Sequence, residues 1–311
     1  MALYTGVRSH GRLESWVRHP SSWMLVSWTA LLQPMAAAMP NVAQLQPLLT
    51  ESSWRNASKP DACGASMRHA TAWKQLTHQD RGDGLASALS ALQAVAESKW
   101  IPGVSRASNG RVDPILGSIR SNPAAVSYYS RVAKDLSIST ICEVGYNWGA
   151  SSLVWLHSNP QARVISFDLF DRAYSNATFA WLNERYNGRL TMIAGDSTRT
   201  IPAFARQHAD RKICDLVLVD GDHSYEGEIT NVRNFRRVAK CGGSHYIMDD
   251  CDCTDRNNPT TRAWAKAVQQ EFIVPIAGHL TFALSKSSQK FHVRNEKHSF
   301  CAGLLKGRCD L

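Results

Sequence analysis

Apolar and polar positions alternate in two different ways along the second half of the chain. Short apolar runs predict five β-strands, at 140–144, 163–169, 190–194, 215–219 and 245–248. Stretches with apolar residues at helical spacing predict the helices between and around them, at 123–136, 150–157, 178–186, 201–208, 225–239 and 260–272. A closing pair of strands is predicted at 279–284 and 291–294. This alternation with short connections indicates an α/β fold with a parallel sheet covered on both faces.

The N-terminal part has a different pattern. Residues 1–40 place Arg8, Arg12 and Arg18 ahead of a modest apolar stretch and a run of small residues. This order predicts a targeting segment, secretory or organellar; without such a signal the chain would be cytoplasmic. Contact with a membrane is expected only through this segment, because the apolar stretch is too short and too polar for a confident span.

The following region, 41–118, is rich in Ala, Ser and Gln, and its one persuasive helix is at 84–99. We therefore expect a helical or linker extension at 41–118, one α/β domain at 119–295 and a C-terminal tail at 296–311.

Charge and cysteine content narrow the function only slightly. The formal net charge of +9 favours acidic partners, but the basic residues are scattered, which argues against nucleic-acid binding. Of the eight cysteines, Cys142 and Cys214 lie in or beside apolar runs and are typical of buried structural positions. Cys301 and Cys309 are candidates for a disulfide if the chain is secreted.

Acidic residues follow all five predicted strands. In open α/β sheets, ligands bind at the carboxyl ends of the strands near the point where the strand order reverses. One acid at a strand end is ordinary turn or capping chemistry, but a series of them predicts a site. The residues are Glu143, Asp168, Asp196, Asp220 and the pair Asp249 and Asp250.

The first of these strand ends opens a glycine-containing turn. Gly145 and Gly149 allow the backbone to approach a ligand closely, with Asn147 between them. Asp168 ends the next strand about twenty residues later, where an acid accepts hydrogen bonds from ribose hydroxyls. Alone, the turn would equally suit an NAD enzyme, and Asp168 could be a capping residue.

The ordered set of motifs resembles a class I methyltransferase, dependent on S-adenosylmethionine (SAM). The branch it resembles contains the catechol O-methyltransferase-like and the macrolide or sugar O-methyltransferase-like enzymes. The resemblance covers about half the chain and implies a Rossmann-like, mostly parallel seven-stranded sheet. Its motifs are Glu143-x-Gly145-x-Asn147-x-Gly149, Phe167-Asp168, Gly195-Asp196-Ser197, the run from Asp215 to His223, and Gly242-Gly243 followed by Met248-Asp249-Asp250.

This resemblance implies a role for each motif. Glu143 and Gly145, with Asn147 and Gly149 in the same turn, would contact the methionine end of SAM. Asp168 would bind the ribose, and Asp196 with Ser197 would lie beside the adenine. Asp220 would border the cofactor as well.

A second cluster suggests a divalent metal. Asp220, Asp249 and Asp250 match the metal-ligand positions of the metal-dependent members of the branch, and oxygen ligands suit Mg²⁺. In those enzymes the cation binds a diol-like substrate and lowers a hydroxyl pKa. His223, Asp222 and Asp220 are the catalytic candidates, with His223 or Asp222 as general base; a hydrogen-bonded turn residue is the competing interpretation of His223.

The expected function is O-methylation of a hydroxyl-bearing small molecule. One alternative is a non-catalytic module that kept the fold and SAM binding. Another is an NAD-dependent oxidoreductase, which is weaker because three residues, none of them glycine, separate Gly145 from Gly149.

Overall fold

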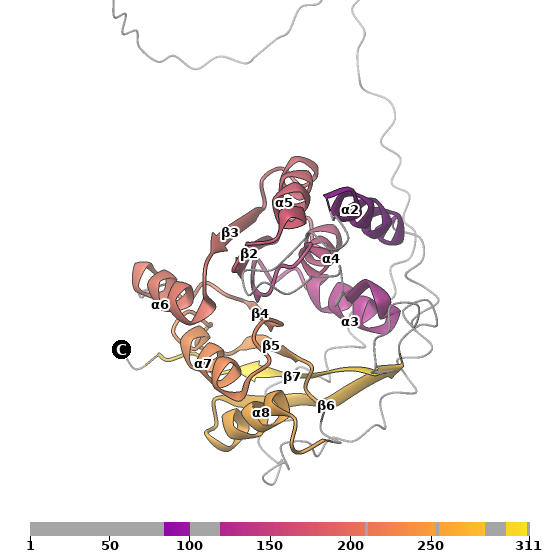
Figure 1. Cartoon of the computed structure of the whole chain (residues 1–311). Helices are drawn as coiled ribbons and strands as arrows, with labels where there is room; N and C mark the ends of the chain where they lie inside the picture. The colour runs from indigo at the N-terminus through magenta and orange to yellow at the C-terminus, as the bar shows by residue number, and fades with distance from the viewer. Residues whose placement is uncertain (1–83, 100–118, 209–210, 253–254, 284–296, 310–311) are drawn as a thin grey trace, which may run out of the picture. The chain divides into compact units, whose positions relative to one another are not determined.

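The structure is a computed structural model that describes residues 84–99, 119–208, 211–252, 255–283 and 297–309. These residues form a seven-stranded sheet with helices on both faces (Figure 1). The strands are β1 (Thr140–Val144), β2 (Arg163–Asp168), β3 (Leu190–Ala194), β4 (Leu216–Val219), β5 (Ser244–Asp249), β6 (Ile273–Ala283) and β7 (Lys297–Leu305). The helices are α2 (Leu85–Lys99), η5 (Ile119–Ser121), α3 (Pro123–Ala133), α4 (Ala150–Ser158), α5 (Ala173–Arg185), α6 (Ser197–Gln207), α7 (Tyr225–Phe235) and α8 (Pro259–Gln269).

The strand order is β3-β2-β1-β4-β5-β7-β6. The first five strands are parallel, and β7 is antiparallel to its neighbours β5 and β6. The prediction of a Rossmann-like, mostly parallel seven-stranded α/β sheet is confirmed. The order reverses between β1 and β4, so a crevice for a ligand is expected at the carboxyl ends of these two strands.

Two apolar cores lie on opposite faces of the sheet. One packs α2, α3, α4 and α5 against the sheet and includes Trp155, whose ring stacks on Tyr129 with centroids 4.7 Å apart. The other lies beneath α6, α7 and α8 and includes Phe235 and Trp264. Helix α2 was predicted in the extension, but Leu89 and Leu92 are buried in the first core, so this helix belongs to the domain.

The described helices differ from the predicted ones at both ends: α5 and α6 begin earlier than predicted, and α3, α7 and α8 end earlier. Helix α6 starts at Ser197, four residues before the predicted start, because the side chain of Asp196 accepts a hydrogen bond from the Thr198 N–H and caps the helix. Helix α5 starts at Ala173 without a side-chain cap, so the sequence carries no capping signal there. None of the helices in the described part of the chain combines the length and apolar character needed to cross a bilayer.

The C-terminal boundary needs correction. Residues 297–305 were assigned to a tail, but they form β7, which lies between β5 and β6. A glycine inside this segment masks the strand pattern; a Cβ at Gly303 would come within 2.7 Å of the Val274 carbonyl oxygen on the neighbouring strand. Strand β6 contains most of the predicted strand 279–284, whereas the predicted strand 291–294 and the predicted targeting segment lie outside the described residues.

Three disulfides join the described cysteines, and the pairing differs from the expected one. Cys301 pairs with Cys251 and Cys309 with Cys241, so the predicted Cys301–Cys309 bond is wrong. Cys142 and Cys214 are fully buried as predicted, but they are bonded to each other, which links β1 to the segment ahead of β4. Sequence separations of 72, 68 and 50 residues explain the error, because pairing over such distances depends on the fold rather than on spacing.

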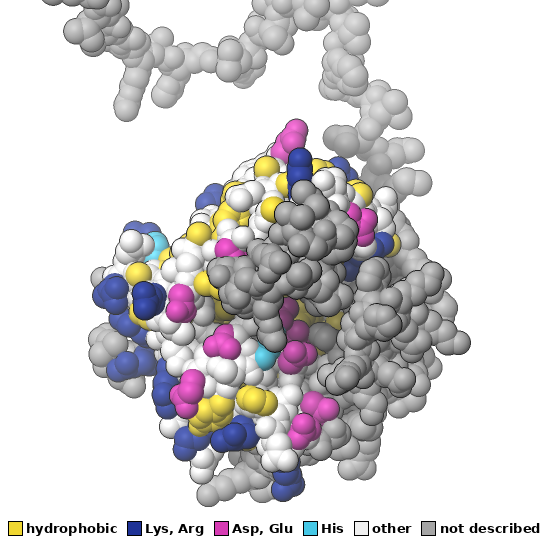
Figure 2. Space-filling view, in the orientation of Figure 1, with side chains coloured by type: hydrophobic (Ala, Val, Ile, Leu, Met, Phe, Trp, Pro, Cys, Tyr) yellow, Lys and Arg dark blue, Asp and Glu magenta, His cyan; other side chains and the backbone are white. Residues whose placement is uncertain are grey.

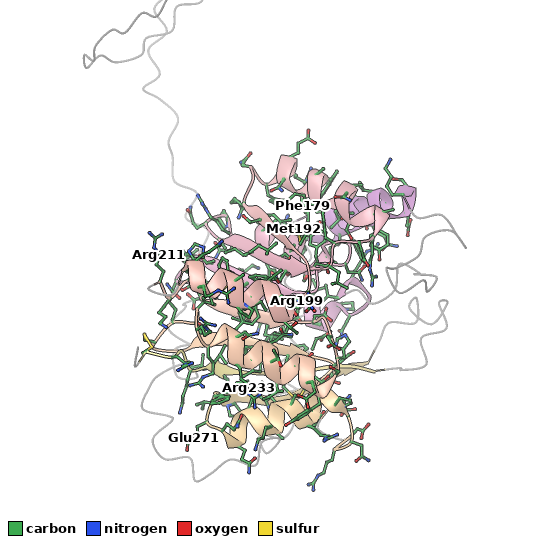
Figure 3. The ribbon with its side chains drawn as sticks, turned by 60° about the vertical axis from the view of Figure 1, so that its left-hand side comes forward. Phe179, Met192, Arg199, Arg211, Arg233 and Glu271 are labelled. Carbon is green, nitrogen blue, oxygen red and sulfur yellow. A yellow bond between two sulfur atoms is a disulfide. The ribbon has the colours of Figure 1, made fainter. Side chains whose placement is uncertain are left out.

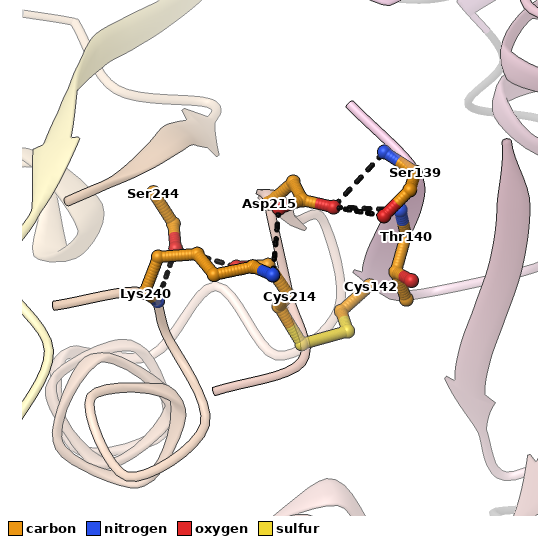
Figure 4. The surroundings of a disulfide bond; sticks show 7 residues. All are labelled: Ser139, Thr140, Cys142, Cys214, Asp215, Lys240 and Ser244. Carbon is orange, nitrogen blue, oxygen red and sulfur yellow. Dashed lines mark hydrogen bonds and ion pairs between the residues drawn. A yellow bond between two sulfur atoms is a disulfide. The ribbon is translucent and has the colours of Figure 1, made fainter. Parts of the chain in front are cut away.

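Polar contacts surround the Cys142–Cys214 disulfide (Figure 4). The Asp215 carboxylate accepts hydrogen bonds from the N–H groups of Ser139 and Thr140, both at 2.9 Å, and forms an ion pair with Lys240 at 3.2 Å. These contacts join the starts of β1 and β4. They lie at the end of the strands opposite the expected crevice.

Candidate functional site

The turn after β1 passes very close to the end of β4. Gly145 has a φ of +92°, and a Cβ at this position would lie 1.7 Å from the carbonyl oxygen of Asp220. Only glycine fits both the backbone conformation and the contact. The turn therefore brings Gly145 and Asp220, two of the predicted site residues, together at the reversal of strand order.

Asp168 at the end of β2 holds the glycine turn in place. Its Oδ2 accepts hydrogen bonds from the N–H groups of Tyr146 at 2.8 Å and Asn147 at 3.3 Å, and its Oδ1 accepts from Phe170 at 2.7 Å. Asn147 has a φ of 52°, and its Oδ1 accepts from the Tyr174 hydroxyl at 2.8 Å. Asp168 thus lies beside the turn, where it also keeps lone pairs for a ligand hydroxyl.

Glu143 points away from the surface of the crevice. The side chain is fully buried, and its carboxylate accepts from Ser151 at 3.0 Å, from Trp155 Nε1 at 3.1 Å and from Ser152. Burial raises the pKa of Glu143 to about 7, although the three hydrogen bonds oppose this shift. The geometry ties Glu143 to α4, so direct contact with a cofactor stays a prediction.

Gly149 and the end of β3 frame the crevice. Gly149 is the N-cap residue of α4, with a φ of +81° and its backbone packed on the Tyr146 ring. Asp196 follows β3, is exposed and caps α6, whose first residue is Ser197. Hydrogen bonds from Thr198 lower the pKa of Asp196, so this group is a carboxylate at neutral pH.

Acidic side chains converge beyond the ends of β4 and β5. His223 Nε2 lies 3.8 Å from Asp220 Oδ1 and 3.8 Å from Asp250 Oδ2. Burial raises the pKa of Asp220 well above its usual range, and the neighbouring Asp249 and Asp250 raise it further. The predicted catalytic and metal-binding residues therefore form one cluster, apart from Asp222, which is exposed and hydrogen bonded to Ser224 within the same turn.

One acid of this cluster was missed by the sequence analysis. Glu228 on α7 is fully buried, and its Oε1 lies 3.9 Å from His223 Nδ1. Burial raises the pKa of Glu228 well above its usual range, and Asp249, Asp222 and Asp250 add to the shift. A signal existed, because Glu228 shares the buried helix face with Val232 and Phe235, where a charged residue is unusual.

The charge at this site contrasts with the rest of the domain. Acidic side chains gather near the centre of the face in Figure 2, whereas most Lys and Arg side chains lie toward its edge. Arg199, Arg211 and Arg233 are exposed on α6, after α6 and on α7, and belong to the outer helical surface (Figure 3). Across the described ranges, no group of three or more Asp, Glu, His or Cys side chains has an arrangement ready to hold a metal ion.

One family model matches the part of the chain that carries the predicted site residues. Residues 142–251, about a third of the chain, match the model of a family described as a methyltransferase domain. This range runs from β1 to the residue after Asp250 and contains the predicted site residues. The segment that carries the predicted site is therefore similar in sequence to a methyltransferase domain.

Solved structures of O-methyltransferases are similar in fold to this chain. The O-methyltransferase TomG from Streptomyces achromogenes, solved with SAM, is 12% identical and has a TM-score of 0.51 over 78% of this chain and 100% of its own. An O-methyltransferase from Bacillus cereus, solved with S-adenosylhomocysteine (SAH), is 12% identical and has a TM-score of 0.50 over 76% of this chain and 97% of its own. No curated protein sequence matches the chain.

Proposed function

We propose that the domain transfers the methyl group of SAM to a hydroxyl of a small molecule. One observation carries the proposal: Gly145, Asp168 and Asp220 meet at the reversal of strand order, on the segment that matches the methyltransferase family. The two solved neighbours named above are O-methyltransferases, which supports oxygen as the acceptor atom.

The residues present suit an adenosyl ligand. Gly145 has no side chain to obstruct the turn, Asp168 offers acceptor capacity for ribose hydroxyls, and Asp196 lies at the next strand end. SAM supplies an activated methyl group, so the protein has to align the acceptor oxygen and exclude water. Direct contact between Glu143 and the cofactor is not needed, because Glu143 supports α4 from within the core.

The acidic cluster would activate the acceptor. His223 is the candidate general base, since its ring borders Asp220 and Asp250 and its side chain is 41% exposed. Asp220 would keep the ring close to the end of β4. Asp222 is a weaker candidate because Ser224 already donates to both of its oxygens.

A divalent cation such as Mg²⁺ fits the chemistry of the donors. Asp220, Asp249 and Asp250 would hold it through carboxylate oxygens, which hard cations prefer. Burial, and then the neighbouring Asp249 and Asp250, raise the pKa of Asp220, and a cation would offset both effects by favouring the charged carboxylate. Bound there, the cation would lower the pKa of an acceptor hydroxyl.

We also propose that the chain folds in an oxidising compartment. Disulfides that include two fully buried pairs are typical of secreted proteins and of the secretory pathway. These disulfides, rather than the pattern of residues 1–40, favour the secretory version of the predicted leader over the organellar one. Mass-spectrometric disulfide mapping of protein from secretory and cytosolic expression tests this; reduced, fully folded protein from the cytosol would count against it.

Calorimetry with SAH, with and without Mg²⁺, tests the main proposal. We expect SAH to bind, and turnover of labelled SAM with catechol or a sugar diol as probe to rise with Mg²⁺. Absence of SAH binding would remove the enzyme proposal. Turnover that ignores the metal would leave metal-free methyl transfer, and SAH binding with no transfer to a panel of hydroxyl compounds would favour the non-catalytic module.

A further inference from the structure

Glu228 is a buried carboxylate that the proposed reaction has not yet used. Its side chain is 0% exposed, and neither of its oxygens has a hydrogen-bond partner among the described residues. Burying such a group is costly unless another group compensates it. A carboxylate in this position on α7 therefore requires an explanation in terms of the site it faces.

The group that Glu228 faces is His223. Glu228 Oε1 lies 3.9 Å from Nδ1, whereas Asp220 Oδ1 and Asp250 Oδ2 each lie 3.8 Å from Nε2. These distances exceed those of hydrogen bonds, and small ring movements would bring the atoms within hydrogen-bond distance. The imidazole thus has an acid close to each nitrogen, with one nitrogen toward the helix and the other toward the ends of β4 and β5.

The exposures of the two sides differ. Asp250 is 52% exposed at its side chain, whereas the Glu228 side chain is fully buried on α7. Exposed carboxylates can turn toward solvent, a metal or a substrate, but Glu228 is fixed by the packing of α7, whose neighbouring Ile229 and Val232 lie in the core. Glu228 is therefore the fixed contact of the ring.

We propose that Glu228 is a positioning residue that keeps the His223 ring oriented with Nε2 toward Asp220 and Asp250. This inference rests on the proposed function, in which Nε2 faces the acceptor hydroxyl. A buried acid next to one ring nitrogen of a functional histidine fixes which nitrogen faces the substrate. At metal sites, a carboxylate or carbonyl next to the non-coordinating nitrogen orients the histidine ring in the same way. Glu228 itself does not touch the substrate.

The test compares Glu228→Gln with Glu226→Gln. Glu226 is exposed in the same first turn of α7, so its variant controls for the loss of a charge at this helix end. With the diol probe, we expect Glu228→Gln to lower kcat by on the order of tenfold, with KM and SAH affinity unchanged. Glu228→Asp should recover part of kcat, whereas Glu226→Gln should match the unchanged protein.

A second measurement reports on the ring without any turnover. With ¹⁵N-labelled histidine, the ring signals of His223, assigned through His223→Gln, should change in Glu228→Gln and stay the same in Glu226→Gln. Unchanged ring signals together with unchanged kcat in Glu228→Gln would overturn the proposal. If SAH fails to bind the unchanged protein, the proposed function fails, but the ring signals still decide whether Glu228 orients His223. If Glu228→Gln does not fold, the ring signals are compared between Glu228→Asp and Glu226→Gln instead.

Discussion

Asp168 Oδ2 lies 2.8 Å from the backbone nitrogen of Tyr146 and accepts its hydrogen bond. This contact joins the end of β2 to the glycine turn after β1. A residue expected to bind ribose therefore also fixes the loop on which the cofactor would lie. The two roles reinforce one another, because a carboxylate that holds the turn is itself held in place.

Replacement of Asp168 should weaken cofactor binding through both roles. We expect Asp168→Ala to lower SAH affinity about tenfold to a hundredfold, since hydrogen bonds to a charged group are lost and the turn is loosened. Calorimetry measures the effect. Asp171→Ala, exposed three residues later, serves as the control; equal affinity in the two variants would show that the ribose is bound elsewhere.

The acid pair after β5 should matter for the metal and not for the cofactor. In the double variant Asp249→Asn and Asp250→Asn, we expect the stimulation of turnover by Mg²⁺ to disappear and SAH affinity to stay unchanged, because amides are poorer ligands for a hard cation. A titration of turnover against Mg²⁺ measures this. Asp255→Asn in the exposed part of the same loop is the control, and full stimulation in the double variant would argue against the ligand assignment.

The Cys251–Cys301 disulfide should stabilise the domain and the acid pair together. Because it closes a loop between residues 50 positions apart, its removal by Cys251→Ala and Cys301→Ala should lower the free energy of unfolding by about 2–4 kcal/mol. Urea denaturation measures this change. The control is the corresponding double variant of Cys241 and Cys309, which are exposed. This control should keep the stimulation of turnover by Mg²⁺, whereas loss of the Cys251–Cys301 disulfide should reduce it. Equal stimulation in both variants would contradict a link between the Cys251–Cys301 disulfide and the site.

Glu143 should make stability depend on pH. Its pKa is raised from 4.5 to about 7 in the folded chain, so the protonated form is favoured by folding. The stabilisation is complete below about pH 4.5 and is lost as the pH rises through about 7. Relative to Glu143→Gln, the unchanged protein should therefore lose stability over this range, by on the order of 3 kcal/mol.

Urea denaturation of both proteins at pH 4.5 and pH 7.5 gives this difference. Glu184→Gln, which changes an exposed acid on α5 and keeps Glu143, should follow the unchanged protein at both pH values. Parallel profiles for the Glu143→Gln variant and the unchanged protein would mean that folding does not raise the pKa of Glu143.

The sequence predicted the fold and the site best at positions where the local backbone or burial restricts the residue type. The parallel strands could be located because buried strands are continuous apolar runs, and two of them, 140–144 and 190–194, have the predicted bounds. Gly145 could be singled out because only glycine tolerates its backbone angle and its contact with Asp220. The acids at the strand ends converge because parallel strands end at one edge of a sheet.

The remaining features depend on contacts between distant segments. No local pattern could place 297–305 between β5 and β6 or pair Cys251 with Cys301. The direction of the Glu143 side chain toward Trp155 follows from the packing of α4 on β1, and a strand-end acid gives no sign of it. Glu228 differs, since its place on the buried face of α7 was visible in the helical spacing.

The insertion of β7 has a consequence for the order of assembly. Among the described strands, β6 pairs with β7 alone, and Cys301 on β7 is the partner of Cys251 beside the acid pair. We therefore expect β5 to keep an open edge until the segment 297–305 docks. We also expect the loop with Asp249 and Asp250 to be secured only at that stage.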